Sequence, residues 1–288
     1  MTSIDDYVEF RKPLLPIEKM KTLCEDPDVY RNATPFPHMI FDEFFDPAIL
    51  ERVLEEFPGE NDIDWRKFAD AKNEIKLASR NEQQIGLFTR YLIYSMNSSA
   101  FLNFLETLTG ISGLLPDPHL WGGGLHQILR GGKLGVHTDF NKYTHMKLDR
   151  RLNVLVYLNR DWQEDWGGHL ELWNRDMSSC VRKVSPMFNR IVCFNTTDYS
   201  FHGHPDPLGC PPDRSRRSLA LYYYSNGRPA DEVSGFHDTA FKSRPSDSID
   251  WHKELSPRQI VKKLVPPIVL DLRRMIKGEP GHKPPKTF

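Results

Sequence analysis

The sequence predicts a mainly β protein with flanking helices, whose strands form an antiparallel sandwich or barrel. After Leu114 the apolar residues change from a helical spacing to an alternating one. The alternating runs are short, and turns rich in Gly, Pro, Asn and Asp separate them. The runs are residues 125–130, 134–138, 151–159, 168–173, 190–195, 200–204 and 216–225. Many short strands with frequent turns are typical of antiparallel sheets.

The first part of the chain is predicted to hold helices and loops. Asp46 is a good N-cap and Pro47 a good first helical residue, and Pro58-Gly59 ends that helix. A second helical pattern covers residues 87–108, with Gly110 as its C-cap. The remaining predictions are an irregular lead-in over residues 1–35, a short strand at 35–42, and a mobile loop over 60–86 that contains one strand at 74–78.

The length of 288 residues allows one sizeable core with additional segments. We predict a helical and loop region at 1–114 that covers the core, a β core at 115–226, and a C-terminal region of loop and basic amphipathic helices at 227–288. The formal net charge is −1. Because nucleic-acid binding needs a concentrated basic face, no nucleic-acid partner is expected.

The cysteines argue for a reducing environment. The four are far apart, without a CxxC pair, which argues against a structural zinc site. The start of the chain has no apolar run of the kind found in secretory signals, and no apolar run is long enough to span a bilayer. We therefore expect a cytoplasmic protein with free thiols.

A metal site is predicted on the 134–138 strand. His137 and Asp139 are two residues apart, so their side chains lie on the same face, roughly 6.6 Å apart along the strand. Two imidazoles and one carboxylate on one face of an octahedron leave three positions open, which is the arrangement of non-haem iron(II) oxygenases. His202 is the best third ligand, because it lies in a strand-like run downstream. A lone His-x-Asp pair is common and carries little weight without the segments that follow it.

Those segments resemble, in order, the catalytic core of the iron(II)- and 2-oxoglutarate-dependent oxygenases, specifically the prolyl-4-hydroxylase-like branch. The similar segments are residues 131–139, 152–162, 167–172, 186–194, 200–202 and 216–223. The resemblance implies a double-stranded β-helix core, also called a jelly roll or cupin-like fold. It also implies iron(II) held by His137, Asp139 and His202, with 2-oxoglutarate and O2 as cosubstrates.

Arg216 is the best candidate for binding 2-oxoglutarate. It shares a strand face with Ser218 and Ala220, which leave room for an acid, and a guanidinium can bind a carboxylate through two parallel hydrogen bonds. The resemblance implies that this group is the distal carboxylate of the cosubstrate. Arg217, on the other face, is the alternative, because the interval from His202 to Arg216 is longer than in the family and contains the proline-rich segment 205–212.

Other residues are expected to lie beside the cosubstrate. Asn153, Leu155 and Tyr157 share a face of the 151–159 strand. The Tyr157 hydroxyl is expected either to reach the same carboxylate or to be part of the core. Asn153 and Ser218 complete the set of cofactor-binding candidates. His204 points to the same side as His202 and is the alternative third metal ligand. The resemblance favours His202, because the family's ligand follows Ser-x, and His204 is then expected to line the pocket or to orient a neighbour.

The resemblance implies a dioxygenase that hydroxylates an unactivated C–H bond, but it leaves the substrate open. The first interpretation is a small molecule or glycan, including a lipid-linked sugar such as Kdo of lipopolysaccharide. A protein side chain, of the prolyl type, is the alternative. A jelly-roll binding module without activity is the third interpretation, and the intact set of His137, Asp139, His202 and Arg216 argues against it.

The C-terminal residues 256–288 contain helical patterns that are both basic and amphipathic. These helices are expected either to pack on the core or to make a peripheral contact with the inner face of an anionic membrane.

Overall fold

The computed structural model describes residues 13–247 of the chain. The chain divides into two units, Met1–Pro245 and Ser246–Phe288, and the first unit holds every described helix and strand. The helices expected within 256–288 lie outside the described residues. Within residues 13–247, no helix is both long and apolar enough to cross a bilayer.

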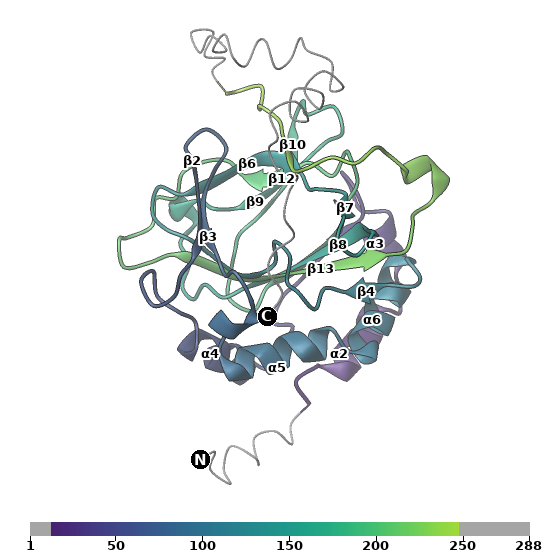
Figure 1. Ribbon diagram of the computed structural model, residues 1–288, viewed down its shortest axis with the longest axis horizontal. Helices are drawn as coiled ribbons and strands as arrows, with labels where there is room; N and C mark the ends of the chain where they lie inside the picture. Colours follow the sequence, from purple (N-terminus) through teal and green to yellow (C-terminus); the bar gives the residue numbers. More distant parts are fainter. Residues whose placement is uncertain (1–12, 248–288) are drawn as a thin grey trace, which may run out of the picture. The chain divides into compact units, whose positions relative to one another are not determined.

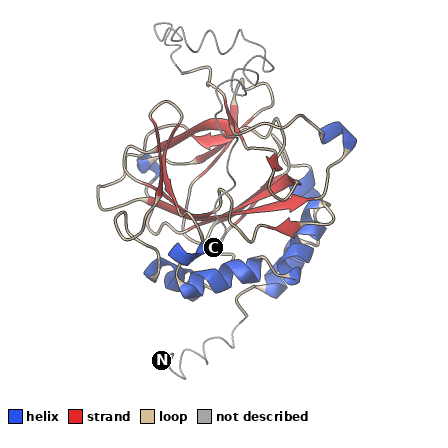
Figure 2. Ribbon diagram, in the orientation of Figure 1, coloured by secondary structure: helices blue, strands red, loops and turns tan. Residues whose placement is uncertain are grey.

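One antiparallel sheet of 14 strands curls on itself to form the centre of the first unit (Figures 1 and 2). Its main path runs in the order β1-β11-β8-β13-β5-β3-β6-β12-β9-β10. The strands are β1 (His38–Phe41), β2 (Arg66–Asp70), β3 (Glu74–Ala78), β4 (Leu115–Pro116), β5 (Gly124–Ile128), β6 (Lys133–Thr138), β7 (Lys142–Tyr143), β8 (Leu148–Tyr157), β9 (Leu170–Trp173), β10 (Cys180–Val184), β11 (Ile191–Asn195), β12 (His202–His204), β13 (Arg216–Ser225) and β14 (Ala240–Phe241). The prediction of a mainly β, antiparallel fold is confirmed.

Helices cover one outer face of the sheet, along its lower and right sides in Figure 2. They are α2 (Ile17–Leu23), α3 (Asp28–Arg31), α4 (Pro47–Glu55), α5 (Leu87–Met96) and α6 (Ser99–Thr109). Two predicted helix ends are confirmed. The Asp46 carboxylate accepts a hydrogen bond from the Ala48 amide at 3.0 Å, and Gly110 follows α6 with a left-handed φ of 77°.

Two predictions for the first part of the chain are wrong. The lead-in contains the helices α2 and α3, whose Met20 and Tyr30 side chains are buried in the core. Pro16 and Pro27 directly precede these helices, so the prolines mark helix starts and not an irregular segment. The segment 60–86 contains the predicted strand at 74–78 as β3, but it also contains β2, which pairs with β3 as a hairpin. Most β2 side chains are exposed, so this strand shows no apolar alternation.

The two longest strands, β8 and β13, separate the core from the interior of the curled sheet. Leu152, Val154 and Val156 of β8 pack in the large apolar cluster beneath the helices. The residues between them face the interior of the sheet. On β13, Leu219 and Leu221 face the helices, whereas Arg216 and Ser218 face the interior. The alternation along these strands therefore places polar side chains inside the curl.

A second feature of the sheet is the close approach of β12 to β6. His202 pairs with His137 and His204 pairs with Leu134, so β6 contains one extra residue between these two pairs. Gly203 lies between the two histidines, against the backbone of β6. A Cβ atom at this position would lie 2.7 Å from the Gly135 carbonyl oxygen and 2.8 Å from the Leu134 carbonyl oxygen.

The Gly203→Ala variant is therefore expected to push β12 away from β6. Overpacking of this kind costs about 1–3 kcal/mol of unfolding free energy, so thermal unfolding should begin several degrees lower. Because His202 and His137 belong to the separated strands, divalent-metal affinity should fall as well. Gly235→Ala is the matched control, since a Cβ atom there meets no atom within 4 Å. Equal unfolding temperatures for the two variants would contradict the close packing of β12 on β6.

Candidate active site

Three potential metal ligands meet inside the curled sheet. His137 is on β6, Asp139 follows the end of that strand, and His202 begins β12 opposite His137. One ligand atom from each of the three side chains lies within 4.8 Å of the other two. The Asp139 Oδ1 atom is 3.7 Å from His137 Nε2, and Asp139 Oδ2 is 3.5 Å from His202 Nε2. The structure therefore brings the three predicted ligands together.

Backbone carbonyls orient both imidazole rings. His137 Nδ1 is 2.8 Å from the Gly135 carbonyl oxygen, and His202 Nδ1 is 2.9 Å from the Ser200 carbonyl oxygen. Because a carbonyl oxygen only accepts, each Nδ1 carries the proton, and each Nε2 presents its lone pair towards Asp139. Burial lowers the pKa of His202 to about 4, so this ring is neutral at neutral pH.

Asp139 is held by a second pair of residues. Asn153 Nδ2 donates to Asp139 Oδ2 at 2.7 Å, and Arg150 Nη2 lies 3.2 Å from Asp139 Oδ1. Arg150 also donates to Asn153 Oδ1 from Nε at 3.1 Å and from Nη2 at 2.6 Å. Burial alone would raise the pKa of Asp139, but the charge of Arg150 holds that pKa well below its usual range. Asp139 is therefore an ionised ligand with a fixed orientation.

The sequence did not identify Arg150, which is buried and stacks on the rings of Tyr222 and Phe140 at 3.5 and 4.4 Å. Strict alternation would place Arg150 on the helix side of β8, with Leu152. The pairing with β13 shifts there, because Tyr224 opposes Arg150 and Tyr223 opposes Leu152. Arg151 is the extra residue, and this bulge turns Arg150 to the interior. No pattern in the sequence marks the bulge.

An enclosed cavity begins at the metal ligands and leads to Arg216. The Arg216 side chain is almost fully buried, and within residues 13–247 it makes no ion pair. Its Nε donates to the Gly168 carbonyl oxygen at 2.8 Å, and its Nη2 donates to the Tyr157 hydroxyl at 3.1 Å. Burial lowers the pKa of this guanidinium, which nevertheless stays protonated. A buried cation without an anionic partner is costly, even when it is hydrogen-bonded. This end of the cavity is therefore suited to an anion.

The other cofactor-binding candidates lie as follows. Asn153 and Ser218 line the same cavity, and Asn153 uses its side-chain amide to hold Asp139. The Tyr157 oxygen accepts from Arg216, which leaves its own O–H free to donate to a bound group. His204 also lines the cavity, and among the described residues neither of its ring nitrogens has a partner. Its place is beside Arg216 and outside the metal cluster.

Arg217, the alternative to Arg216, lies on the opposite face of β13. Its guanidinium is 5.1 Å from the centre of the Phe57 ring, and it lines a separate hollow beneath the sheet. The structure therefore corrects the inclusion of Arg217 among the cosubstrate residues. The alternation along β13 separates the two arginines, and only Arg216 faces the metal side.

An outer cleft of about 380 Å³ opens from the same metal ligands towards the surface. His137, Asp139 and Tyr222 line both the cleft and the enclosed cavity. Aromatic side chains form much of the outer wall, and two of them are exposed at the rim, Trp121 by 55% and Phe236 by 57%. The metal cluster thus lies between an inner space suited to an anion and an outer space open to a larger molecule.

Replacing His202 with Ala is expected to lower the affinity for a divalent metal more than a hundredfold, because loss of a residue that only orients a ligand already costs about 10–100-fold. Asn153→Ala should lower the metal affinity by only about 10–100-fold, since it removes the hydrogen bond to one Asp139 oxygen. Titration calorimetry with Mn²⁺ measures both. His145→Ala is the matched control, because His145 is exposed and lies outside the cluster. Unchanged affinity in His202→Ala would rule out this metal site.

Comparison with known proteins shows what the central part of the chain is similar to. Residues 123–224 match the profile of the family described as the 2OG-Fe(II) oxygenase superfamily. The mouse protein named prolyl 3-hydroxylase OGFOD1 is 30% identical over 79 residues, which are 26% of this chain and 14% of that protein. The matched segment is therefore a small part of the mouse protein.

Solved structures share the fold. A Pseudomonas putida prolyl-4-hydroxylase superposes with a TM-score of 0.51 at 15% identity, over 72% of this chain and 100% of that one. A Trichoplax adhaerens prolyl hydroxylase, solved with a hypoxia-inducible-factor peptide fragment, gives 0.51 at 16% identity, over 73% of this chain and 92% of that one. The predicted double-stranded β-helix is thereby confirmed. Residues 123–224, which carry the His137, Asp139 and His202 cluster, are thus similar to the 2OG-Fe(II) oxygenase superfamily, and the described chain has a prolyl-4-hydroxylase-like fold.

Proposed function

We propose that this protein is an iron(II)- and 2-oxoglutarate-dependent dioxygenase that hydroxylates a prolyl residue of a protein or peptide. The observation that carries the proposal is the continuous path from the outer cleft, past the metal ligands, to the unpaired Arg216. The sequence similarity to a prolyl 3-hydroxylase supports the choice of substrate.

The three ligands suit iron(II). Two neutral imidazoles and one carboxylate form the donor set of non-haem iron(II) sites, and the arrangement leaves positions for a cosubstrate and for O2. Arg150 and Asn153 keep the Asp139 carboxylate in place, and the two backbone carbonyls keep the rings in place. When bound, iron and 2-oxoglutarate supply the oxidising chemistry, in which decarboxylation to succinate is coupled to hydroxylation of a C–H bond.

The inner cavity suits 2-oxoglutarate. The distal carboxylate would accept from Arg216 and from the Tyr157 hydroxyl, which would neutralise the buried guanidinium. Ser218 is small enough to leave space beside the arginine. His204 carries one N–H donor in its neutral form and lies beside the same charge. Apolar side chains, among them Leu155 and Leu170, line the rest of the cavity and limit the access of water.

The outer cleft suits a peptide better than a compact, highly hydroxylated sugar. Its walls combine aromatic rings with charges of both signs, which favours apolar contact together with hydrogen bonding to a backbone. A prolyl ring is apolar and can stack on Trp121 or Phe140. The small-molecule or glycan substrate, including Kdo, stays a prediction that no described feature of the cleft favours.

Substrate class is tested by incubating the enzyme, iron(II), 2-oxoglutarate and ascorbate with a library of proline-containing peptides and with a library of glycans. We expect a mass gain of one oxygen atom on proline in the peptide arm, together with succinate formation. The His137→Ala variant is the control for enzymatic turnover. A mass gain in the glycan arm alone would overturn the prolyl assignment and leave the oxygenase assignment intact.

Arg216→Met is expected to raise the KM for 2-oxoglutarate by roughly 10–100-fold, because a hydrogen bond to a charged group contributes about 1.5–3 kcal/mol. Arg217→Met, one residue away on the other face of β13, should leave this KM within about twofold. Succinate formation at varied 2-oxoglutarate measures both values, and circular dichroism checks folding. A larger effect in Arg217→Met would reverse the assignment of the two arginines.

A further inference from the structure

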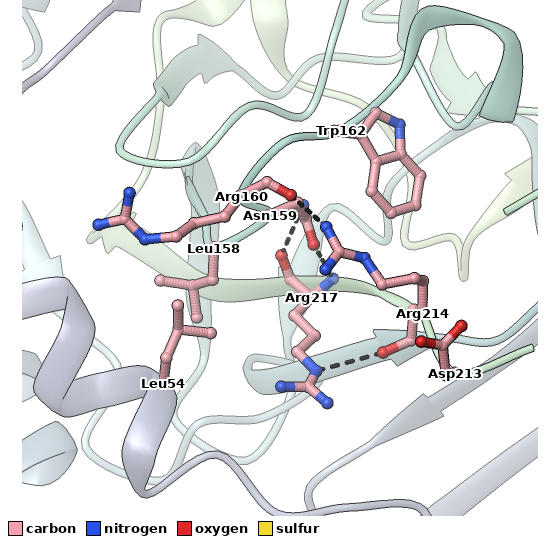
Figure 3. Close-up of a pocket in the computed structure, with 9 residues that line it drawn as sticks. Leu54, Leu158, Asn159, Arg160, Trp162, Asp213, Arg214 and Arg217 are labelled. Atoms are coloured by element: carbon pink, nitrogen blue, oxygen red, sulfur yellow. Dashed lines mark hydrogen bonds between the residues drawn. The ribbon is translucent and has the colours of Figure 1, made fainter. Parts of the chain in front are cut away.

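A second hollow lies beneath the sheet, on the side of β8 and β13 that faces α4, and has a volume of about 290 Å³ (Figure 3). Leu54 of α4 and Leu158 form an apolar wall, and Trp162 lies near the opposite side. The other lining residues are Asn159, Arg160, Asp213, Arg214, Ser215 and Arg217. The hollow thus holds three arginines, and none of them lines the cavity at the metal ligands.

Only one of the three arginines has its charge balanced within the described chain. Arg160 forms an ion pair with Glu51. Arg214 and Arg217 make no ion pair within residues 13–247, and Asp213 at the same hollow is exposed and pairs with neither. The half-buried Arg217 has a lowered pKa, because burial and the nearby charge of Arg214 both disfavour its cation. Two guanidiniums thus line one hollow without a counterion among the described residues.

The hydrogen bonds around the hollow fix the two arginines and leave donors free. Arg214 Nη2 donates to the Arg160 carbonyl oxygen, and Arg217 Nε donates to Ser215 Oγ at 3.2 Å (Figure 3). Asn159 clamps the backbone of Arg217, since its Oδ1 accepts from the Arg217 amide at 2.7 Å and its Nδ2 donates to the Arg217 carbonyl oxygen at 3.1 Å. Both Nη groups of Arg217 have no partner among the described residues. The site is therefore organised before any ligand arrives.

We propose that this hollow binds a phosphate-type dianion, either free phosphate or a phosphate ester, through Arg214 and Arg217. Two planar guanidiniums match the two charges and the oxygen geometry of a phosphate group. The apolar wall of Leu54 and Leu158, with Trp162 near the opposite side, offers surfaces for the organic part of an ester. The site is separate from the oxygenase centre, because the alternation along β13 places Arg216 and Arg217 on opposite faces.

The proposal is tested by titration calorimetry with inorganic phosphate and with phenyl phosphate, at constant ionic strength. All titrations use the full chain carrying Arg216→Met, so that the cosubstrate cavity adds no anion binding of its own. We expect saturable binding at one site. Tighter binding of phenyl phosphate identifies an ester as the ligand, and equal binding identifies the free ion. Binding of neither probe overturns the proposal.

Substitutions of Arg214 and Arg217 test whether phosphate binds at this hollow. Arg214→Gln and Arg217→Gln should each weaken binding at least about tenfold, because each removes a charge-assisted contact. Arg217→Lys keeps the charge and should retain part of the affinity, which separates charge from folding. Arg182→Gln is the matched control, since Arg182 is exposed on β10 and lies outside the hollow. Wild-type affinity in both Gln variants, or equal loss in Arg182→Gln, would overturn the assignment.

Discussion

The pairing of β12 with β6 is the contact on which the active centre depends. It places His202 directly opposite His137, although 65 residues separate them in the sequence. The pairing needs Gly203, because only a residue without a Cβ atom allows the two backbones to approach so closely. The carbonyl oxygens of Gly135 in β6 and of Ser200, just before β12, then fix the two rings. The ligand geometry is therefore a consequence of backbone pairing.

Side chains alternate along β8 and β13, so the two faces of each strand have different roles. One face of each strand supplies apolar residues to the core under the helices, and the other face supplies polar residues to the cavity. The strands whose apolar face stabilises the fold thus also hold the functional side chains in position. On β13 the neighbouring residues Arg216 and Arg217 lie on opposite faces, so they line two separate hollows.

The sequence predicted the parts of the site that follow from regular strands. His137 and Asp139 were recognised by their spacing, and the face that carries Arg216 was recognised by alternation. His202 was chosen from its strand-like run and by resemblance, because the pairing that brings it to the other ligands is not local in sequence. The strand β3 was predicted, whereas β2 was not, since its exposed side chains carry no apolar period. The helices α2 and α3 were missed because prolines at their starts were interpreted as breaks.

Arg150 was missed for a different reason, which is that a bulge reverses the face of a strand without leaving a signal in the sequence. Its position explains why Asp139 can stay ionised while buried. Burial raises the pKa of this carboxyl group and would weaken it as a ligand, and the adjacent guanidinium opposes this effect. The stacking of Arg150 on Tyr222 and Phe140 also ties it to the walls of the outer cleft. Arg150 therefore contacts both the metal-binding carboxylate and the aromatic wall of the outer cleft.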